Sequence, residues 1–300
     1  YTVAKWLTAS FSVNGILEKY RTVGADYNSN FANPWAKPAY ESLYNSDGSL
    51  KYNYYSYDGN AYYTPEAGLE DGGSNPLDEY YNNTQTTHRQ YLRYHGDLLF
   101  KIIDGLTAQA QFVYEKNHTT VDWLLTQDSH AMRMMKNAFA KYDPETGSVS
   151  YMTPESGGML NTSNTDGRYW TARGQLNYNK AFGKHEISAL AGLEFRETHS
   201  NGTRALLLGY DDQLQISSTH TVDLGAMRQL TYAPYYMTTG SSYGFPAHQM
   251  VYVPYIENSM GIIADSHHKY ASGYFNATYT YDSRYNIFGS FRKDYADVYG

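Results

Sequence analysis

The chain contains no cysteine, and it has no stretch of roughly 18 consecutive apolar residues, the length that a transmembrane helix needs. The first absence excludes disulfide bonds, thiolate metal sites and cysteine nucleophiles. The second excludes a membrane-spanning helix. Charged residues make up only 18% of the chain, with a formal net charge of −7 and a pI near 5.8. This acidic balance argues against a nucleic-acid-binding surface.

Tyrosine is unusually abundant, with 34 residues against 30 Asp and Glu residues together. The aromatic content is 16%, whereas the apolar content of 41% lies below the range of about 45–50% that is typical of globular proteins. The chain begins at Tyr1 and ends at Gly300 within sequence that reads as a strand, without a signal peptide. We therefore expect it to be a segment of a longer protein.

Strict alternation of apolar and polar residues recurs in blocks, which predicts β-strands. Four clear blocks and three weaker ones give seven predicted strands, at 106–115, 169–178, 187–196, 271–281, 7–14, 92–102 and 285–294. Each block has about the 9–11 residues that a tilted strand needs to cross a bilayer.

The two faces of these blocks differ in character. The polar faces carry full charges, whereas the apolar faces carry small residues with aromatic residues at their ends, such as Trp170 and Tyr178 on one strand. Such ends are typical of the aromatic girdles of membrane barrels, because the ring tolerates lipid while its polar atom reaches water. A soluble β-sandwich also buries one face of alternating strands, so alternation alone leaves both architectures open.

The lengths of the connections favour the barrel. Short turns alternate with long connections: the turns are Asp104-Gly105, 179–184 and 282–284, and the long connections are about 15–87, 116–168 and 197–268. If the strands run alternately up and down, all long loops lie at one end, as in an outer-membrane barrel. Seven strands cannot close such a barrel, and open edges are too costly in lipid. We predict an all-β fold, a partial antiparallel transmembrane β-barrel, with residues 1–300 forming part of one barrel domain.

Two stretches, Gly183–Glu197 and Tyr274–Asp294, resemble strands of the SusC/RagA-type TonB-dependent transporters of Bacteroidetes. Gly183–Glu197 resembles the FGKHxIxALAGxExRE strand of that family, and Tyr274–Asp294 resembles the hairpin that follows it. Weaker likenesses to the family's first large loop region and to one of its periplasmic turns occur at Asn33-Pro34, Tyr44–Gly48, Asn75–Leu77 and Ile103–Thr107.

The resemblance implies a 22-stranded barrel with a plug domain in its lumen and a TonB box, neither of which is matched by this sequence. About seven strands and three extracellular loops of that barrel would lie in this chain. The implied partners are a SusD-like surface lipoprotein, the TonB–ExbB–ExbD complex acting through the plug, and outer-membrane lipid. No cofactor and no nucleic acid are expected. The implied location is the outer membrane of a Gram-negative, Bacteroidetes-like cell.

No catalytic constellation is found in the sequence. A Gly-x-Ser-x-Gly elbow is absent, and Gly183-Lys184 lacks the upstream glycine of a phosphate loop, so it reads as a hairpin turn. His267 and His268 are adjacent and therefore lie on opposite faces of a strand, which disfavours a shared metal ion. Residues 129–142 have apolar residues at helical spacing, which predicts a short helix that packs on its own loop rather than on a lid protein.

Two groups of residues are candidates for contact with a solute or with the plug. Aromatic rings that carry a polar group suit both the faces of sugars and protein interfaces. Most of the aromatic residues in the loops are expected to pack against other residues of the loops. The loop candidates for substrate contact are Trp35, Tyr55, Tyr57, Trp123, Tyr235, Tyr236, Tyr243 and Tyr255. The candidates for charge pairs along the inner wall and contact with the plug are Arg173, Glu194, Arg196, Arg292 and Asp294.

The function implied by the resemblance is TonB-dependent import of a nutrient across the outer membrane, without covalent chemistry. An oligosaccharide or glycan is the common substrate of the family, and a peptide, as in RagA-like transporters, is the alternative. A secreted, Tyr-rich β-sandwich that binds glycans is a competing hypothesis. A β-rich glycoside hydrolase is disfavoured because Glu194 has no evident carboxylate partner at the required separation of about 5–9.5 Å.

Overall fold

The computed structural model describes residues 2–23, 42–52, 70–142, 145–146, 148–217, 222–229, 256 and 261–297. In chain order the elements are β1 (Thr2–Ala4), β2 (Leu7–Val23), α2 (Pro76–Asn82), β3 (Asn83–Ile103), β4 (Leu106–Leu125), α3 (His130–Ala138), β5 (Ala140–Tyr142), β6 (Val149–Tyr151), β7 (Gly158–Phe182), β8 (His185–Tyr210), α4 (Leu224–Gln229), β9 (Ile262–Tyr281) and β10 (Tyr285–Ala296). None of the described helices is long and apolar enough to cross a membrane.

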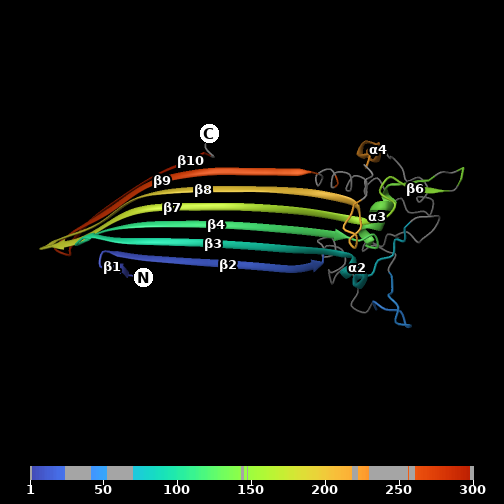
Figure 1. The fold of residues 1–300 in the computed structure, drawn as a ribbon, viewed down its shortest axis with the longest axis horizontal. Coiled ribbons are helices and arrows are strands. Elements are labelled where there is room, and N and C mark those ends of the chain that lie inside the picture. The colour runs from blue at the N-terminus through green and yellow to red at the C-terminus, as the bar shows by residue number, and fades with distance from the viewer. Residues whose placement is uncertain are drawn as a thin grey trace.

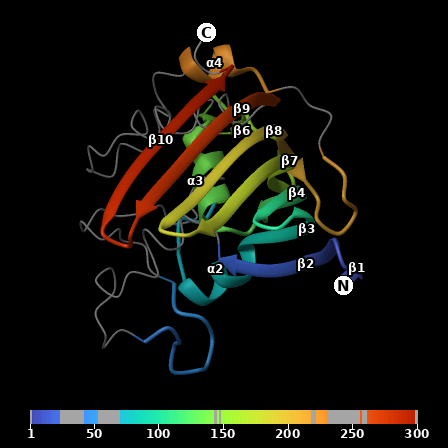
Figure 2. The same ribbon diagram turned by 90° about the vertical axis from the view of Figure 1, so that its left-hand side faces the viewer.

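Eight strands form one antiparallel sheet in the order β1-β2-β3-β4-β7-β8-β9-β10. Seen from the turns, the direction of the strands rotates steadily from β2 to β10 (Figure 2), which is the twist expected of a curved wall. The predicted fold class, an antiparallel all-β segment of a barrel, is confirmed. The seven predicted strands correspond to the seven long strands of the sheet, and β1 is an additional short strand.

The connections separate two ends of the sheet, as predicted. Short turns join β3 to β4, β7 to β8 and β9 to β10 at one end, the turn end, whereas the helices lie at the other, the loop end (Figure 1). Gly105 in the first turn has a φ of 81°, and a Cβ there would lie 2.6 Å from the carbonyl oxygen of Asn179. Only glycine fits this turn without strain.

The strands are much longer than the alternation predicts. β7 has 25 residues and β8 has 26. The predicted boundaries of the long connections are therefore wrong. The segments between the strands are 24–82, 126–157 and 211–261, in place of about 15–87, 116–168 and 197–268. At the loop end the outer positions become polar, so hydrophobic alternation ceases while strand pairing continues.

Polar cross-strand pairs accompany this extension of the strands. Thr162 donates its hydroxyl to Asp122 at 2.5 Å, and Thr120 donates to Asn164 at 2.8 Å. Hydrogen-bonded pairs between neighbouring strands stabilise a sheet by about 0.2–1 kcal/mol each. Such pairs leave no hydrophobic pattern in the sequence, which is why the predicted strands end too early.

The register divides the strands into two faces. We call the face that carries Arg173 and Glu194 the inner face, and the face that carries Ala172 and Leu193 the outer face. Residues between the strands at the loop end fold back onto the inner face and bury an apolar cluster, here called the loop core. Its members are Leu125, Met132, Met135, Phe139, Ala140, Met159, Leu206, Leu208, Met227 and Ile256.

Helix α3 contributes the middle of the loop core. Ser129 caps the helix by accepting the N–H of Met132 at 3.2 Å, which satisfies one of the free donors of the first turn. The helix ends at Ala138, earlier than the predicted 129–142, because the chain turns into β5. As predicted, it packs on its own loop, together with the inner-face ends of the strands.

Candidate functional site

Charged residues are paired along the inner face. Arg173 on β7 and Glu194 on β8 lie directly opposite each other in the register. The Nε of Arg173 lies 2.8 Å from Oε2 of Glu194, and a second guanidinium nitrogen contacts the same oxygen. Two charge-assisted hydrogen bonds therefore hold this pair in a fixed orientation.

The last two strands carry a second pair and a stacked arginine. On β10 the Nε of Arg292 lies 2.9 and 3.0 Å from the two carboxylate oxygens of Asp294, and its Nη2 donates to Ser272 on β9 at 3.3 Å. Arg196 on β8 lies over the ring of Tyr270, 5.2 Å from its centroid. This cation–π contact directs the guanidinium along the inner wall.

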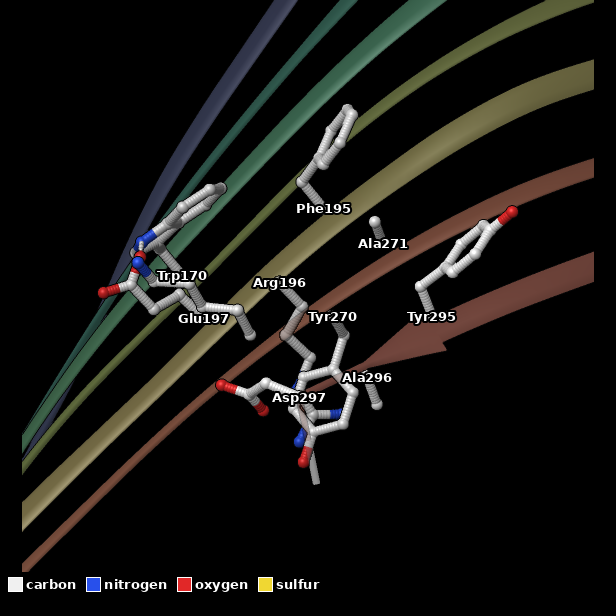
Figure 3. Close-up of a pocket in the computed structure, with 10 residues that line it drawn as sticks. Trp170, Phe195, Arg196, Glu197, Tyr270, Ala271, Tyr295, Ala296 and Asp297 are labelled. Carbon is white, nitrogen blue, oxygen red and sulfur yellow. Dashed lines mark hydrogen bonds between the residues drawn. The ribbon is translucent and has the colours of Figure 1, made fainter. Parts of the chain in front are cut away.

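These side chains line a cavity of about 240 Å³ on the inner face near the end of β10. Its lining residues are Glu194, Arg196, Tyr270, Ser272, Arg292, Asp294, Tyr295 and Ala296. The structure thus brings four of the five predicted wall residues together, and the fifth, Arg173, reaches the cavity through its pair with Glu194. Figure 3 shows the adjoining pocket, in which Arg196 and Tyr270 project to one side of the sheet while Phe195 and Ala271 project to the other.

A larger hollow of about 500 Å³ continues along the inner face, and Arg173 and Arg196 line it as well. Within it the Nε of Arg93 lies 3.2 Å from Oε1 of Glu115. The same carboxylate oxygen accepts the hydroxyl of Tyr91 at 2.9 Å. The inner wall therefore presents alternating donors and acceptors, which suit a polar solute or a polar protein surface.

Two inner-face tyrosines that shape this wall are not among the predicted site residues. Tyr274 lies across Gly192 of the neighbouring strand: a Cβ on Gly192 would lie 2.3 Å from the tyrosine ring. Its hydroxyl donates to Gln175 at 3.0 Å. Tyr169 covers Gly167 in the same manner, at 2.5 Å from a Cβ. Glycine at an inner position within reach of a tyrosine is the sequence signal that could have identified both.

At the loop end, the buried side chain of Asn75 joins two segments. It caps α2 by accepting the N–H of Leu77 at 2.9 Å. Its amide donates to the carbonyl oxygens of Leu43 at 3.0 Å and Lys51 at 2.8 Å. The two loop motifs that resemble the SusC/RagA family on either side of residues 53–69 therefore meet in the structure.

Two basic residues of α3 bind the chain segment that precedes α2. Lys136 is 5% exposed and forms an ion pair with Glu70. Arg133 donates to the carbonyl oxygens of Asp71 at 2.6 Å and Gly73 at 2.8 Å. These bonds and the loop core make the described part of the loop end one packed body.

Glu79 of α2 is a buried carboxylic acid at the contact between α2 and α3. It is 2% exposed and accepts the backbone N–H of His130 at 2.5 Å. Burial raises the pKa of Glu79 to about 7, and Asp78 also raises it, whereas the His130 N–H and nearby Arg133 oppose the shift. This carboxyl group therefore changes its charge near neutral pH.

Of the predicted loop aromatics, Trp123 lies within the described residues. Its indole N–H donates to Asn83 at 2.8 Å, and its ring packs against the loop core. The candidates that lie outside the described residues are Trp35, Tyr55, Tyr57, Tyr235, Tyr236, Tyr243 and Tyr255.

The adjacent histidines are separated by the sheet. His267 lies on the outer face, with its Nε2 2.7 Å from Glu197, whereas His268 lies on the inner face, with its Nδ1 3.5 Å from Asp297. Over the ranges that the structure describes, no group of three or more histidine, aspartate or glutamate side chains is arranged to hold a metal ion.

A polar cavity of about 1070 Å³ lies among the connections at the loop end. Its acidic lining residues are Asp128, Glu155, Asp211 and Asp212. Pockets for small-molecule ligands measure about 300–1,000 Å³, so this cavity lies at the upper end of that range.

The outer face is apolar along one rung of the sheet, here called the apolar rung, which runs straight across the seven long strands. Its members are Leu7, Phe100, Ala108, Leu176, Ala191, Phe275 and Phe291.

The apolar part of the outer face ends at a different residue on each strand. To locate this end, we follow the outer positions of each strand from the apolar rung toward the loop end until the first charged or amide side chain. These residues, here called the boundary residues, are Lys19, Gln90, Lys116, Arg168, Glu197, Lys269 and Lys293.

The boundary residues form a diagonal across the sheet. Counted from the apolar rung toward the loop end, Lys19 lies 12 residues away on β2, Lys116 lies 8 away on β4, and Lys269 lies 6 away on β9. Between β2 and β9 the boundary thus falls by about 20 Å along the strands over about 24 Å across them. The strands are therefore inclined by about 40° to the perpendicular of the line at which their outer face becomes polar, close to the tilt of strands from the axis in barrels.

No protein-family model and no curated protein matches the chain. Among solved structures, the fold is similar to that of the RagAB peptide transporter, with a TM-score of 0.61 and 16% sequence identity over 98% of this chain. It is also similar to the RagAB peptide importer in its closed-closed state, with a TM-score of 0.58 and 15% identity over 98% of this chain. In both comparisons this chain spans 26% of the length of the solved chain. At these identities the likeness establishes the fold alone, which matches a segment of each of these longer chains.

Proposed function

We propose that this chain is part of the wall of a TonB-dependent outer-membrane transporter that imports a nutrient. The observation that carries the proposal is the diagonal of boundary residues on the outer face. A water-soluble sheet has no reason to change from apolar to polar along a line inclined to its strands. Tilted strands that cross a flat bilayer must do so, because the membrane surface cuts each strand at a different residue.

The height of the apolar band supports the same conclusion. On β4 the outer face is apolar from Leu106 to Tyr114, and on β8 from Ile187 to Phe195. Nine residues of strand extend about 30 Å, which corresponds to a height of about 23 Å at a tilt of about 40°. The lipid-facing band of outer-membrane barrels is about 25 Å tall.

The exposure of the outer face argues against the secreted β-sandwich. Phe112, Leu193 and Phe275 are 50%, 57% and 48% exposed. A sandwich would cover these side chains with a second sheet, and no described element of the chain lies over them. Lipid would cover them in a membrane wall.

The inner wall supplies the transport path in this proposal. Its paired charges face the lumen, where they contact the plug and the passing solute. Arg292→Ala would remove the cation that is paired with Asp294 and weaken the hold of the wall on the plug. Uptake and plug retention that are unchanged in this variant would contradict the assigned role.

We propose an oligosaccharide or a peptide as the nutrient. The family resemblance favours an oligosaccharide, whereas the similarity in fold to the RagAB peptide transporter supports a peptide as the second candidate. A SusD-like lipoprotein at the loop end and the TonB–ExbB–ExbD complex acting on the plug complete the proposed assembly.

The proposal is tested with the full-length protein that contains this segment. We expect it in the outer-membrane fraction, with a shift in electrophoretic mobility on heating that is typical of barrels. Deletion of its gene should abolish growth on one class of nutrient, with oligosaccharide mixtures and peptide mixtures tested separately. Recovery of the protein in the soluble secreted fraction would refute the membrane assignment and favour the sandwich.

A further inference from the structure

Most boundary residues at the loop end are basic. Five are lysine or arginine, one is neutral and one, Glu197, is acidic. Glu197 is engaged locally, because it accepts the indole N–H of Trp170 at 3.2 Å and lies 2.7 Å from Nε2 of His267. The belt of boundary residues therefore has an excess of positive charge where the outer face meets its polar surroundings.

Lys116 and Arg168 form the densest part of this belt. They lie directly opposite each other on β4 and β7, and both are exposed. The next positions in the same rung are His199 and His267, so four basic side chains stand in a row across four strands.

The two histidines differ from Lys116 and Arg168 in their partners. His199 lies 2.7 Å from Asp265, and His267 lies 2.7 Å from its own carboxylate partner. For Lys116 and Arg168, by contrast, there is no ion pair with any residue of the described chain. Like charges directly opposite each other destabilise a strand pair, and an anion between them removes that cost.

The position of the pair on the strands points to the kind of anion. One rung nearer the turn end, the outer positions of the same strands hold Tyr114 and Trp170. Rings of this type lie at the level of lipid headgroups, with the acyl chains on one side and water on the other. The cations of Lys116 and Arg168 therefore lie where the phosphate groups of a lipid would be.

We propose that Lys116 and Arg168 bind a phosphate group of an anionic lipid headgroup in the outer leaflet, with its acyl chains on the apolar band below. This inference rests on the proposed membrane location and goes beyond it, because it assigns a specific ligand to the outer face. The guanidinium offers a fork to two phosphate oxygens, and the ammonium adds a second positive charge.

The test uses the purified full-length transporter and lipid A as the probe. Native mass spectrometry measures retention of lipid A with its phosphates and of the same lipid after removal of the phosphates. Each cation near a membrane surface contributes about a fivefold change in binding, so Lys116→Gln or Arg168→Gln should weaken retention about fivefold and the double variant about 25-fold.

Two control variants accompany the test. Lys180→Gln removes a cation from the outer face at the turn end, where Lys180 lies 3.4 Å from Asp104, and should leave retention unchanged. The exchange Lys116→Arg with Arg168→Lys keeps both charges and should retain the lipid. This second control separates loss of charge from loss of folding.

Three results would overturn the inference. The double variant could retain phosphorylated lipid A as well as the wild type does, the wild type could retain both lipids equally, or millimolar inorganic phosphate could displace the lipid completely. The double variant should still import nutrient, because neither side chain is on the inner face. A wild-type protein that is absent from the outer-membrane fraction would refute the proposed function and this inference together.

Discussion

The buried carboxyl group of Glu79 makes the stability of the loop end depend on pH. Its pKa is raised from 4.5 to about 7 in the folded loop, where it contacts the start of α3. When the loop opens, the carboxyl group reaches water and its pKa returns to the lower value. Between these two values the folded loop binds more protons than the open loop, so stability falls as pH rises.

The difference in pKa sets the size of the effect. It corresponds to about 3 kcal/mol of loop-opening free energy, which is fully present below the lower pKa and lost as pH rises through the upper one. Glu79→Gln keeps an oxygen that accepts the N–H of His130 but cannot ionise. We expect this variant to have a loop stability that is flat between pH 5 and 8, and greater than that of the wild type at pH 8.

Hydrogen exchange of the α3 amides in the full-length protein measures this opening. After correction for the intrinsic pH dependence of exchange, wild-type protection should fall by about 100-fold between pH 5 and 8, whereas protection in Glu79→Gln should stay constant. Glu155→Gln is the matched control, because Glu155 is an exposed carboxyl group at the same end of the sheet, in the connection 126–157 that also carries α3. Parallel pH profiles of wild type and Glu79→Gln would refute the reasoning.

Three further substitutions test the packing of the wall and the loop end. Gly192→Val places a side chain where the ring of Tyr274 lies and should lower the stability of the barrel by about 1–3 kcal/mol, as measured by thermal unfolding in detergent, with Gly96→Val as a control at an open position. Phe139→Ala empties a fully buried site in the loop core and should cost about 3–5 kcal/mol, seen as faster proteolysis of the loop end with unchanged heat-modifiable mobility. Asn75→Ala removes the side-chain donor to the Lys51 carbonyl oxygen and one of the two donors to the Leu43 carbonyl oxygen, and should cost about 1–3 kcal/mol, detected as faster exchange in residues 43–51.

The fold was predictable because strands with one apolar face and one polar face repeat a simple pattern. The outer positions of β4 and β8 alternate with polar inner positions over nine residues, and this periodicity identifies the strands and their facing. The extended ends of the strands were not predictable in the same way. Thr162 and Asp122 stabilise them through polar contacts that carry no hydrophobic signal.

The inner wall was predictable as a set of charges, but its individual contacts were not. Arg173 and Glu194 occupy polar positions of neighbouring strands, yet only the register shows that they lie opposite each other. Arg196 contacts the ring of Tyr270 rather than a carboxylate group. Tyr270 lies on β9, which follows a long connection, so the local sequence around Arg196 does not indicate this contact. Pairings between residues that are far apart in the chain are set by register and loop length, and composition does not specify them.

The proposed function requires the boundary residues to lie at one depth in a membrane, although their distances from the apolar rung along the strands differ. The chain has no cysteine, so single spin labels can be placed at Lys19→Cys, Lys116→Cys and Lys269→Cys in the full-length protein, provided that its other segments are free of cysteine. Accessibility to oxygen and to a water-soluble nickel complex then gives the depth of each label in liposomes. The membrane assignment predicts equal depths at the lipid–water boundary for all three, and a deeply buried label at Leu193→Cys. Depths that differ by up to about 20 Å in the order of the rungs, or four labels equally exposed to water, would contradict it.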